Sequence, residues 1–141
     1  MKKRRVLCVT ALAVVFVVLA VCVWYWMPVS FLRGVDSNEV AAIAVFNGTN
    51  GHHMMLEDRA DIDAVVDNIQ SVKLQRGKYM PDVDGFVFSL TFTGRDGRKI
   101  DSFIINNSSE LRDDPFFYEC KNGELCSDLL WALEDRYCGA Q

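Results

Sequence analysis

The chain has 141 residues, half of them hydrophobic, a size that accommodates one domain. Its first 32 residues contain four basic side chains and no acidic one. From Arg33 onward the remaining 11 Lys and Arg face all 19 Asp and Glu, so this part has a formal charge of −8 with both histidines neutral. Such an acidic surface repels nucleic-acid phosphates, and we therefore expect no nucleic-acid partner.

An uncharged stretch, Val6 to Trp26, follows the basic residues Lys2 to Arg5. As a helix, its 21 residues span roughly 31 Å, close to the thickness of the bilayer hydrocarbon. A cleavable signal has a shorter apolar region, followed by a polar stretch and a small-x-small site. Here the chain stays apolar to its aromatic end. We therefore predict an uncleaved transmembrane helix over residues 6–27.

Two other readings of this segment stay open. The residues LAVC, ending at Cys22, resemble a lipobox, which would make Cys22 a lipidated N-terminus. Val21, however, stands where a small residue is usual before the cysteine, and VWYWMP follows where a lipoprotein turns polar. Cleavage as a secretory signal is the third alternative.

The flanking residues predict the orientation of the helix. Residues 1–5 form a basic tail that favours the cytoplasmic side. Trp24, Tyr25 and Trp26 are amphipathic residues where the helix is expected to leave the membrane, and Pro28 discourages its continuation. We expect a short tether over residues 28–38 and a domain outside the cell membrane over 39–141.

The first half of this domain reads as two strands and a helix. Apolar residues predict strands over 39–47 and 52–56, separated by the turn residues GTNG. The period then changes, because Ile62, Val65, Val66 and Ile69 recur at helical spacing. Asp58 precedes them as the expected N-cap of that helix.

The centre of the domain predicts a β-hairpin. Segments 85–92 and 99–106 flank GRDGR, whose Asp96 and Gly97 suit a two-residue type I′ turn. That turn pairs Leu90 with Phe103 and aligns the two strands. One face of the hairpin then collects Phe86, Phe88, Leu90, Phe92, Phe103 and Ile105. The opposite face is mixed, and we expect it to be the binding face, with Val87, Ser89, Thr91, Ser102 and Ile104.

A second helix is predicted from Asp128 to Tyr137, with Ser127 as its N-cap. Its apolar side chains are expected to pack on the aromatic face of the hairpin; they are Leu129, Leu130, Leu133 and Tyr137. The predicted fold class is α+β, with an N-terminal transmembrane helix followed by one antiparallel-sheet domain that has two helices packed on one face.

Residue types that carry out catalysis or bind metals are sparse. His52 and His53 are neighbours, and side chains of neighbouring strand residues point to opposite faces, so they do not share one metal ion. PDVDG, residues 81–85, lacks the further ligands of a calcium loop and reads as a turn. No nucleophile has a visible base. We expect no metal, no cofactor and no enzymatic activity.

Three cysteines follow Phe117, and their pairing stays open. Cys126 and Cys138 bracket the last helix and lie too far apart for a disulfide. A three-residue loop in CKNGELC would place Cys120 across from Cys126, and we favour this disulfide slightly. A Cys120–Cys138 pair and three free thiols are the alternatives.

The order of these segments resembles a group of small extracytoplasmic domains of unknown function from Gram-positive, clostridia-like bacteria. The resemblance rests on the helix with the following RGK, the aromatic hairpin and LRDDPFFYEC, and it covers residues 40–136. It implies a signal or anchor before the domain. It implies no activity and no site residues.

These observations favour a membrane-anchored extracytoplasmic binding or accessory module. The expected partners are the membrane, crossed once with the N-terminus inside, and an envelope protein or wall component. An enzyme acting on envelope polymers and a small envelope inhibitor or immunity protein are the alternatives.

The anchor prediction is testable on the membrane fraction. If residues 6–27 stay in the mature protein, the full chain should resist extraction by salt and carbonate and keep its basic N-terminus. N-terminal mass analysis checks this. A mature N-terminus at Cys22 carrying diacylglycerol would contradict it in favour of the lipoprotein.

Overall fold

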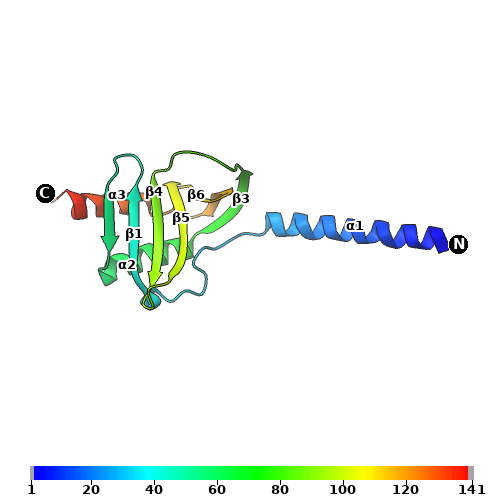
Figure 1. Cartoon of the computed structure of the whole chain (residues 1–141), viewed down its shortest axis with the longest axis horizontal. Helices are drawn as coiled ribbons and strands as arrows, with labels where there is room; N and C mark the ends of the chain where they lie inside the picture. Colours follow the sequence, from blue (N-terminus) through cyan, green and yellow to red (C-terminus); the bar gives the residue numbers. More distant parts are fainter. Residues whose placement is uncertain (1, 140–141) are drawn as a thin grey trace.

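A computed structural model describes residues 2–139 of the chain (Figure 1). The elements, in chain order, are α1 (Lys2–Trp26), the 3-10 helix η1 (Ser37–Glu39), β1 (Val40–Asn47), β2 (His53–Leu56), α2 (Arg59–Ser71), β3 (Lys73–Tyr79), β4 (Phe88–Gly94), β5 (Lys99–Asn107), β6 (Glu110–Asp113), β7 (Phe116–Asn122) and α3 (Ser127–Cys138). The predicted α+β class is confirmed.

The strands form one sheet in the order β2-β1-β4-β5-β6-β7-β3, and every neighbouring pair is antiparallel. Helix α1 projects from the domain beside β3, whereas β2 and the C-terminal end of α3 lie on the opposite side (Figure 1). Residues Lys3–Trp26 form a helix long and apolar enough to cross a membrane.

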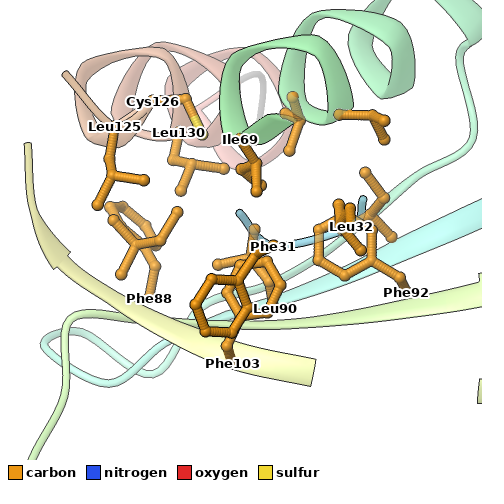
Figure 2. Packing of buried hydrophobic residues seen from close by; sticks show 14 of the residues in the cluster. Phe31, Leu32, Ile69, Phe88, Leu90, Phe92, Phe103, Leu125, Cys126 and Leu130 are labelled. Carbon is orange, nitrogen blue, oxygen red and sulfur yellow. The ribbon is translucent and has the colours of Figure 1, made fainter. Parts of the chain in front are cut away.

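Helices α2 and α3 supply the apolar layer that covers one face of the sheet. Asp58 caps α2 as predicted, since its carboxylate accepts hydrogen bonds from the backbone N–H groups of Ala60 and Asp61. The four residues predicted at helical spacing are buried: Ile62, Val65, Val66 and Ile69. They pack in one core with the inner face of the sheet (Figure 2).

Helix α3 begins one residue earlier than predicted. Ser127 is its first helical residue, and the N-cap is Cys126, which makes no side-chain capping bond. Leu130 and Leu133 are fully buried, as expected for the face that packs on the sheet. Tyr137 instead lies at the surface, where its hydroxyl donates a 2.9 Å hydrogen bond to Asp61. The helix is therefore joined to α2 by a polar contact as well as by the core.

The central hairpin has the predicted register but a different turn. Leu90 pairs with Phe103, and Phe88 pairs with Ile105. The turn, however, closes between Gly94 and Arg98, and Gly97 adopts a left-handed φ of 77°. This places one extra residue in the loop, and a bulge beside Phe92 shifts the pairing back. The predicted type I′ turn is therefore wrong. The predicted register is correct all the same, because the bulge offsets the extra loop residue.

The residues predicted to be a tether pack against the domain. Val29 forms a two-way backbone bridge with Leu74 of β3, with N–O distances of 2.7 and 2.9 Å. Phe31 lies edge-on against Phe103 and Tyr118, with ring centroids 5.2 and 5.0 Å away. Phe31 is buried in the core (Figure 2). We call residues 28–36 the strap.

The one-sided core predicts an asymmetric response to mutation. Phe88→Ala and Leu90→Ala should each lower the free energy of unfolding by roughly 2 to 5 kcal/mol, because both side chains are fully buried. Ser89→Ala and Thr91→Ala should change it by less than about 1 kcal/mol. Denaturant titration of the four variants measures the difference, and equal losses on both faces would contradict a sheet covered on one side.

Candidate functional site

The face of the sheet away from the helices carries a continuous cross-strand row. The register aligns His53, Phe46, Ser89, Ile104, Arg112 and Phe117 on six neighbouring strands. A second row beside it runs through Met55, Ala44, Thr91 and Ser102. We call these two rows the open face. Most of its side chains are half-buried rather than packed in the core.

Two shallow hollows adjoin on the open face. The first has a volume of about 250 Å³ and is lined by Ser89, Thr91, Ser102, Phe103, Ile104, Arg112, Asp113 and Asp114. The second has a volume of about 260 Å³ and is lined by Ala44, Val45, Phe46, His53, Met54, Met55, Ser89 and Thr91. The hollows share Ser89 and Thr91, so a ligand that fills both lies across the strands. Ser89 and Thr91 have short side chains, so the wall between the two hollows is low.

Arg112 forms the charged wall of the first hollow. Its side chain is only 7% exposed, which is unusual for a cation. One terminal nitrogen donates to the carbonyl of Gly85 at 3.0 Å, and the other donates to Asp114 at 3.3 Å. Nε lies 2.9 Å from the second Asp114 oxygen, but its N–H is not aimed at it, so this contact is an ion pair without a hydrogen bond. Arg112 thus holds the β3–β4 loop beside the hollow.

Asp113 is a titratable side chain that lines the same hollow. Burial raises the pKa of its carboxyl, and the neighbouring carboxylates of Asp101 and Asp114 raise it further. A carboxyl whose pKa is raised in this way holds a proton at a higher pH than an exposed one. This is the property required of a general acid.

The expected binding residues fall into two groups. Ser89, Thr91, Ser102 and Ile104 line the first hollow, where the structure brings them together. Val87 packs against the hydrophobic core instead. Phe86, predicted for the buried face, lies 5.5 Å from the ring of Phe46 on the open face. The alternation of β4 therefore does not extend back to these two residues, because the strand begins at Phe88.

Sequence reasoning missed Arg112 and Phe46 as members of this face. Arg112 lies on β6, a strand of four residues with no apolar alternation, so no local pattern indicated it. Phe46 lies on a strand that was predicted, and alternation within β1 places it opposite the buried Val45. Only the pairing of β1 with β4 brings it beside Ser89.

The histidines lie in different surroundings. His53 stacks on Phe46 with ring centroids 4.3 Å apart. His52 places Nδ1 2.6 Å from the carboxylate of Glu134. Within residues 2–139 no group of three or more His, Cys, Asp or Glu side chains is arranged to hold a metal ion.

Glu134 is a buried carboxylate that joins α3 to the β1–β2 turn. It accepts hydrogen bonds from the side-chain amides of Asn47 and Asn50 at 2.6 and 2.5 Å, and it contacts His52. Burial by itself would raise the pKa of Glu134, but these hydrogen bonds and the charge of His52 outweigh burial and lower it. These contacts use both carboxylate oxygens of Glu134 within the domain, which indicates a structural role.

The cysteines are free in this structure. The hairpin that would align Cys120 with Cys126 does not form, because β7 ends at Asn122 and Leu125 bonds to the backbone of Ser108 instead. Cys120 contacts the Ser108 carbonyl through its thiol. Burial raises the pKa of the Cys126 thiol to about 12, so it behaves as a small apolar side chain.

No protein-family description, curated protein or solved structure matches the chain. The resemblance to small extracytoplasmic domains therefore stays a prediction. Only the geometry described above bears on the function.

The Glu134 cluster predicts a pH-dependent stability. A carboxyl whose pKa is lower in the folded than in the unfolded state stabilises the fold above the unfolded pKa, and this contribution is lost as the pH falls through the folded pKa. Glu134→Gln should thus lower the free energy of unfolding by roughly 1 to 3 kcal/mol at neutral pH and by less in acid. Denaturant titrations of both proteins at several pH values measure the gap. A gap that stays constant into acid would contradict the prediction.

Proposed function

We propose that the protein is a membrane-anchored binding module that engages an envelope protein or wall component through its open face. The anchor is α1, which is long and apolar enough to cross a membrane. The basic residues at its N-terminus favour an orientation with the domain outside the cytoplasm. The observation that carries the proposal is the pair of adjoining hollows on an uncovered sheet face.

The composition of the open face favours recognition. Ser89 and Thr91 offer hydroxyl donors and acceptors at the shared wall of the hollows, and Ser102 adds a hydroxyl in the first hollow. Phe46 and Met55 add apolar area in the second hollow, and Met55 is 51% exposed. Apolar surface with a few placed polar groups is typical of a binding site. Each hollow is too small for a drug-sized ligand and suits one side chain or one sugar ring of an extended partner.

The rigidity of this face supports the same conclusion. The open face lies on neighbouring strands of one ladder, and Arg112 ties the β3–β4 loop to its rim. A surface that is already ordered loses little conformational entropy when a partner binds. Binding by a preformed sheet face therefore requires no rearrangement of the domain.

An enzyme acting on envelope polymers is the second candidate. Asp113 favours it, since its raised pKa and its place in the first hollow suit a general acid. Asp113→Asn discriminates the two. It should abolish hydrolysis of wall polymers if the protein is an enzyme, and it should leave partner capture unchanged if the protein is a binding module that does not use Asp113.

The binding proposal is tested by blocking the shared wall. Thr91→Arg places a long charged side chain between the hollows and should lower capture of the envelope partner by the detergent-solubilised full chain at least about tenfold. Capture is quantified by mass spectrometry against membrane and wall fractions. Arg is chosen because Thr91 lines both hollows, so one long side chain at this position obstructs each of them.

Ser71→Arg is the matched control. Ser71 is exposed near the C-terminal end of α2, so the substitution adds the same side chain and charge away from the open face. This variant should capture as much partner as the parent chain. Equal capture by Thr91→Arg and the parent, with both folded by circular dichroism, would overturn the proposal.

A further inference from the structure

The end of α1 is joined to β3 by a set of specific contacts. The Tyr25 hydroxyl donates a 2.6 Å hydrogen bond to the carbonyl of Gly77, and the Gln75 amide donates to the Tyr25 carbonyl at 3.2 Å. Arg76 donates to the Trp24 carbonyl at 2.8 Å, and its guanidinium lies 3.9 Å from the centroid of the Trp24 ring. The last turn of α1 and the edge strand β3 therefore lie side by side.

These contacts determine the height of β3 above a bilayer. Trp and Tyr at the end of a transmembrane helix lie at the level of the lipid headgroups. Since β3 bonds to Trp24 and Tyr25, it lies at the same level. Figure 1 shows β3 as the strand beside α1, with the remaining strands following away from it. The membrane-facing edge of the domain is thus β3.

This edge is basic, although the domain as a whole is acidic. Strand β3 reads KLQRGKY, with three cations and no acid, in a part of the chain whose formal charge is −8. Lys73 and Lys78 are exposed, and among residues 2–139 neither of them forms an ion pair. Tyr79, next along the strand, is 62% exposed. An exposed tyrosine beside lysines is typical of a surface at the headgroup level.

A hollow extends this surface between the strap and β3. Its volume is about 560 Å³, and it is lined by Pro28, Ser30, Arg33, Gly34, Gln70 and Lys73. The lining contains two cations and no acid, and Ser30 adds a hydroxyl group. The Gln70 amide already donates to the carbonyls of Leu32 and Val35, so it holds the strap in place beside the hollow. Arg and Lys are the side chains that bind phosphate groups in proteins. The hollow begins two residues after the last residue of α1.

We propose that Arg33, Lys73 and Lys78 form a surface that binds the phosphates of anionic lipid headgroups in the leaflet where α1 ends. Lipid is the occupant because the bilayer already lies against this edge, whereas a protein partner would have to enter between β3 and the membrane. The proposal rests on α1 crossing the membrane and is independent of the partner of the open face. Its consequence is a domain held close to the bilayer.

The test uses the full chain in lipid nanodiscs. One set of discs contains phosphatidylcholine alone, and in the other about one lipid in five is phosphatidylglycerol, which supplies the anionic surface. Amide hydrogen exchange of the peptide covering residues 73–80 is measured by mass spectrometry. Exchange should slow roughly fivefold in the anionic discs, and about 1 M salt should remove the slowing because it screens charges beyond ~3 Å. Exchange of the β2 peptide, residues 53–56, should stay unchanged.

The variant Lys73→Gln/Lys78→Gln should lose this slowing. Its matched control is Arg95→Gln/Arg98→Gln, which removes the same charge from exposed residues on the β4–β5 turn and should keep the slowing. Thermal unfolding verifies that both variants fold. Co-elution of the chain with the discs reports insertion of α1 separately, so failure of the anchor is distinguished from failure of the lipid surface.

Three results would overturn the proposal for an inserted chain. The first is equal exchange of residues 73–80 in the two kinds of disc. The second is the same slowing in Lys73→Gln/Lys78→Gln as in the parent chain, or its loss in the control. The third is an equal slowing when inorganic phosphate is added to discs of phosphatidylcholine, which would assign the surface to soluble phosphate.

Discussion

The packing of Phe31 between Phe103 and Tyr118 is the contact on which the arrangement of this protein depends. It places the strap inside the core of the domain, and the strap begins directly after α1. The bridge between Val29 and Leu74 then extends the sheet beyond β3 by one pair. Because the chain leaves the helix and enters the core within a few residues, the domain has little freedom to turn about α1. Strand β3 is consequently the edge beside the helix, and β2 is the far edge.

The one-sided cover of the sheet explains the character of the open face. Helices α2 and α3 bury the inner face, where Phe88, Leu90 and Phe92 are fully buried. Among residues 2–139 no helix covers the outer face in this way, so its side chains, hydroxyl and apolar alike, are mostly half-buried. Arg112 is the exception, since it is buried on that face and needs both Asp114 and the Gly85 carbonyl to offset its desolvation. The same contacts shape the first hollow.

The charge of β3 is opposite in sign to the net charge of the domain. The basic strand β3 lies beside the helix, while the domain as a whole carries an excess of acid. Acidic side chains elsewhere are repelled by an anionic surface, and the lysines of β3 are attracted to it. For a domain held at an anionic bilayer, as proposed, both effects favour the orientation in which β3 faces the lipid. In the proposed membrane-bound arrangement, the open face remains accessible to a partner.

The sequence by itself determined the elements whose burial repeats at short range. The length of the apolar segment determined α1, the spacing of Ile62, Val65, Val66 and Ile69 determined α2, and the alternation of β4 and β5 determined which of their faces is buried. This alternation also predicted four residues of the open face, which are Ser89, Thr91, Ser102 and Ile104. These patterns are visible because a residue's exposure follows from its position within one regular element.

Only the tertiary structure decided which strands pair and what meets across them. Strand β6 has only four residues and β3 is rich in cations, so neither has an apolar pattern. Both are strands because their backbones form ladders with β7. The strap was predicted to be a tether because nothing local shows that Phe31 meets Phe103 and Tyr118. Backbone hydrogen bonds are chemically alike for nearly all residues and join segments far apart in the chain. They therefore leave little trace in the sequence of either partner.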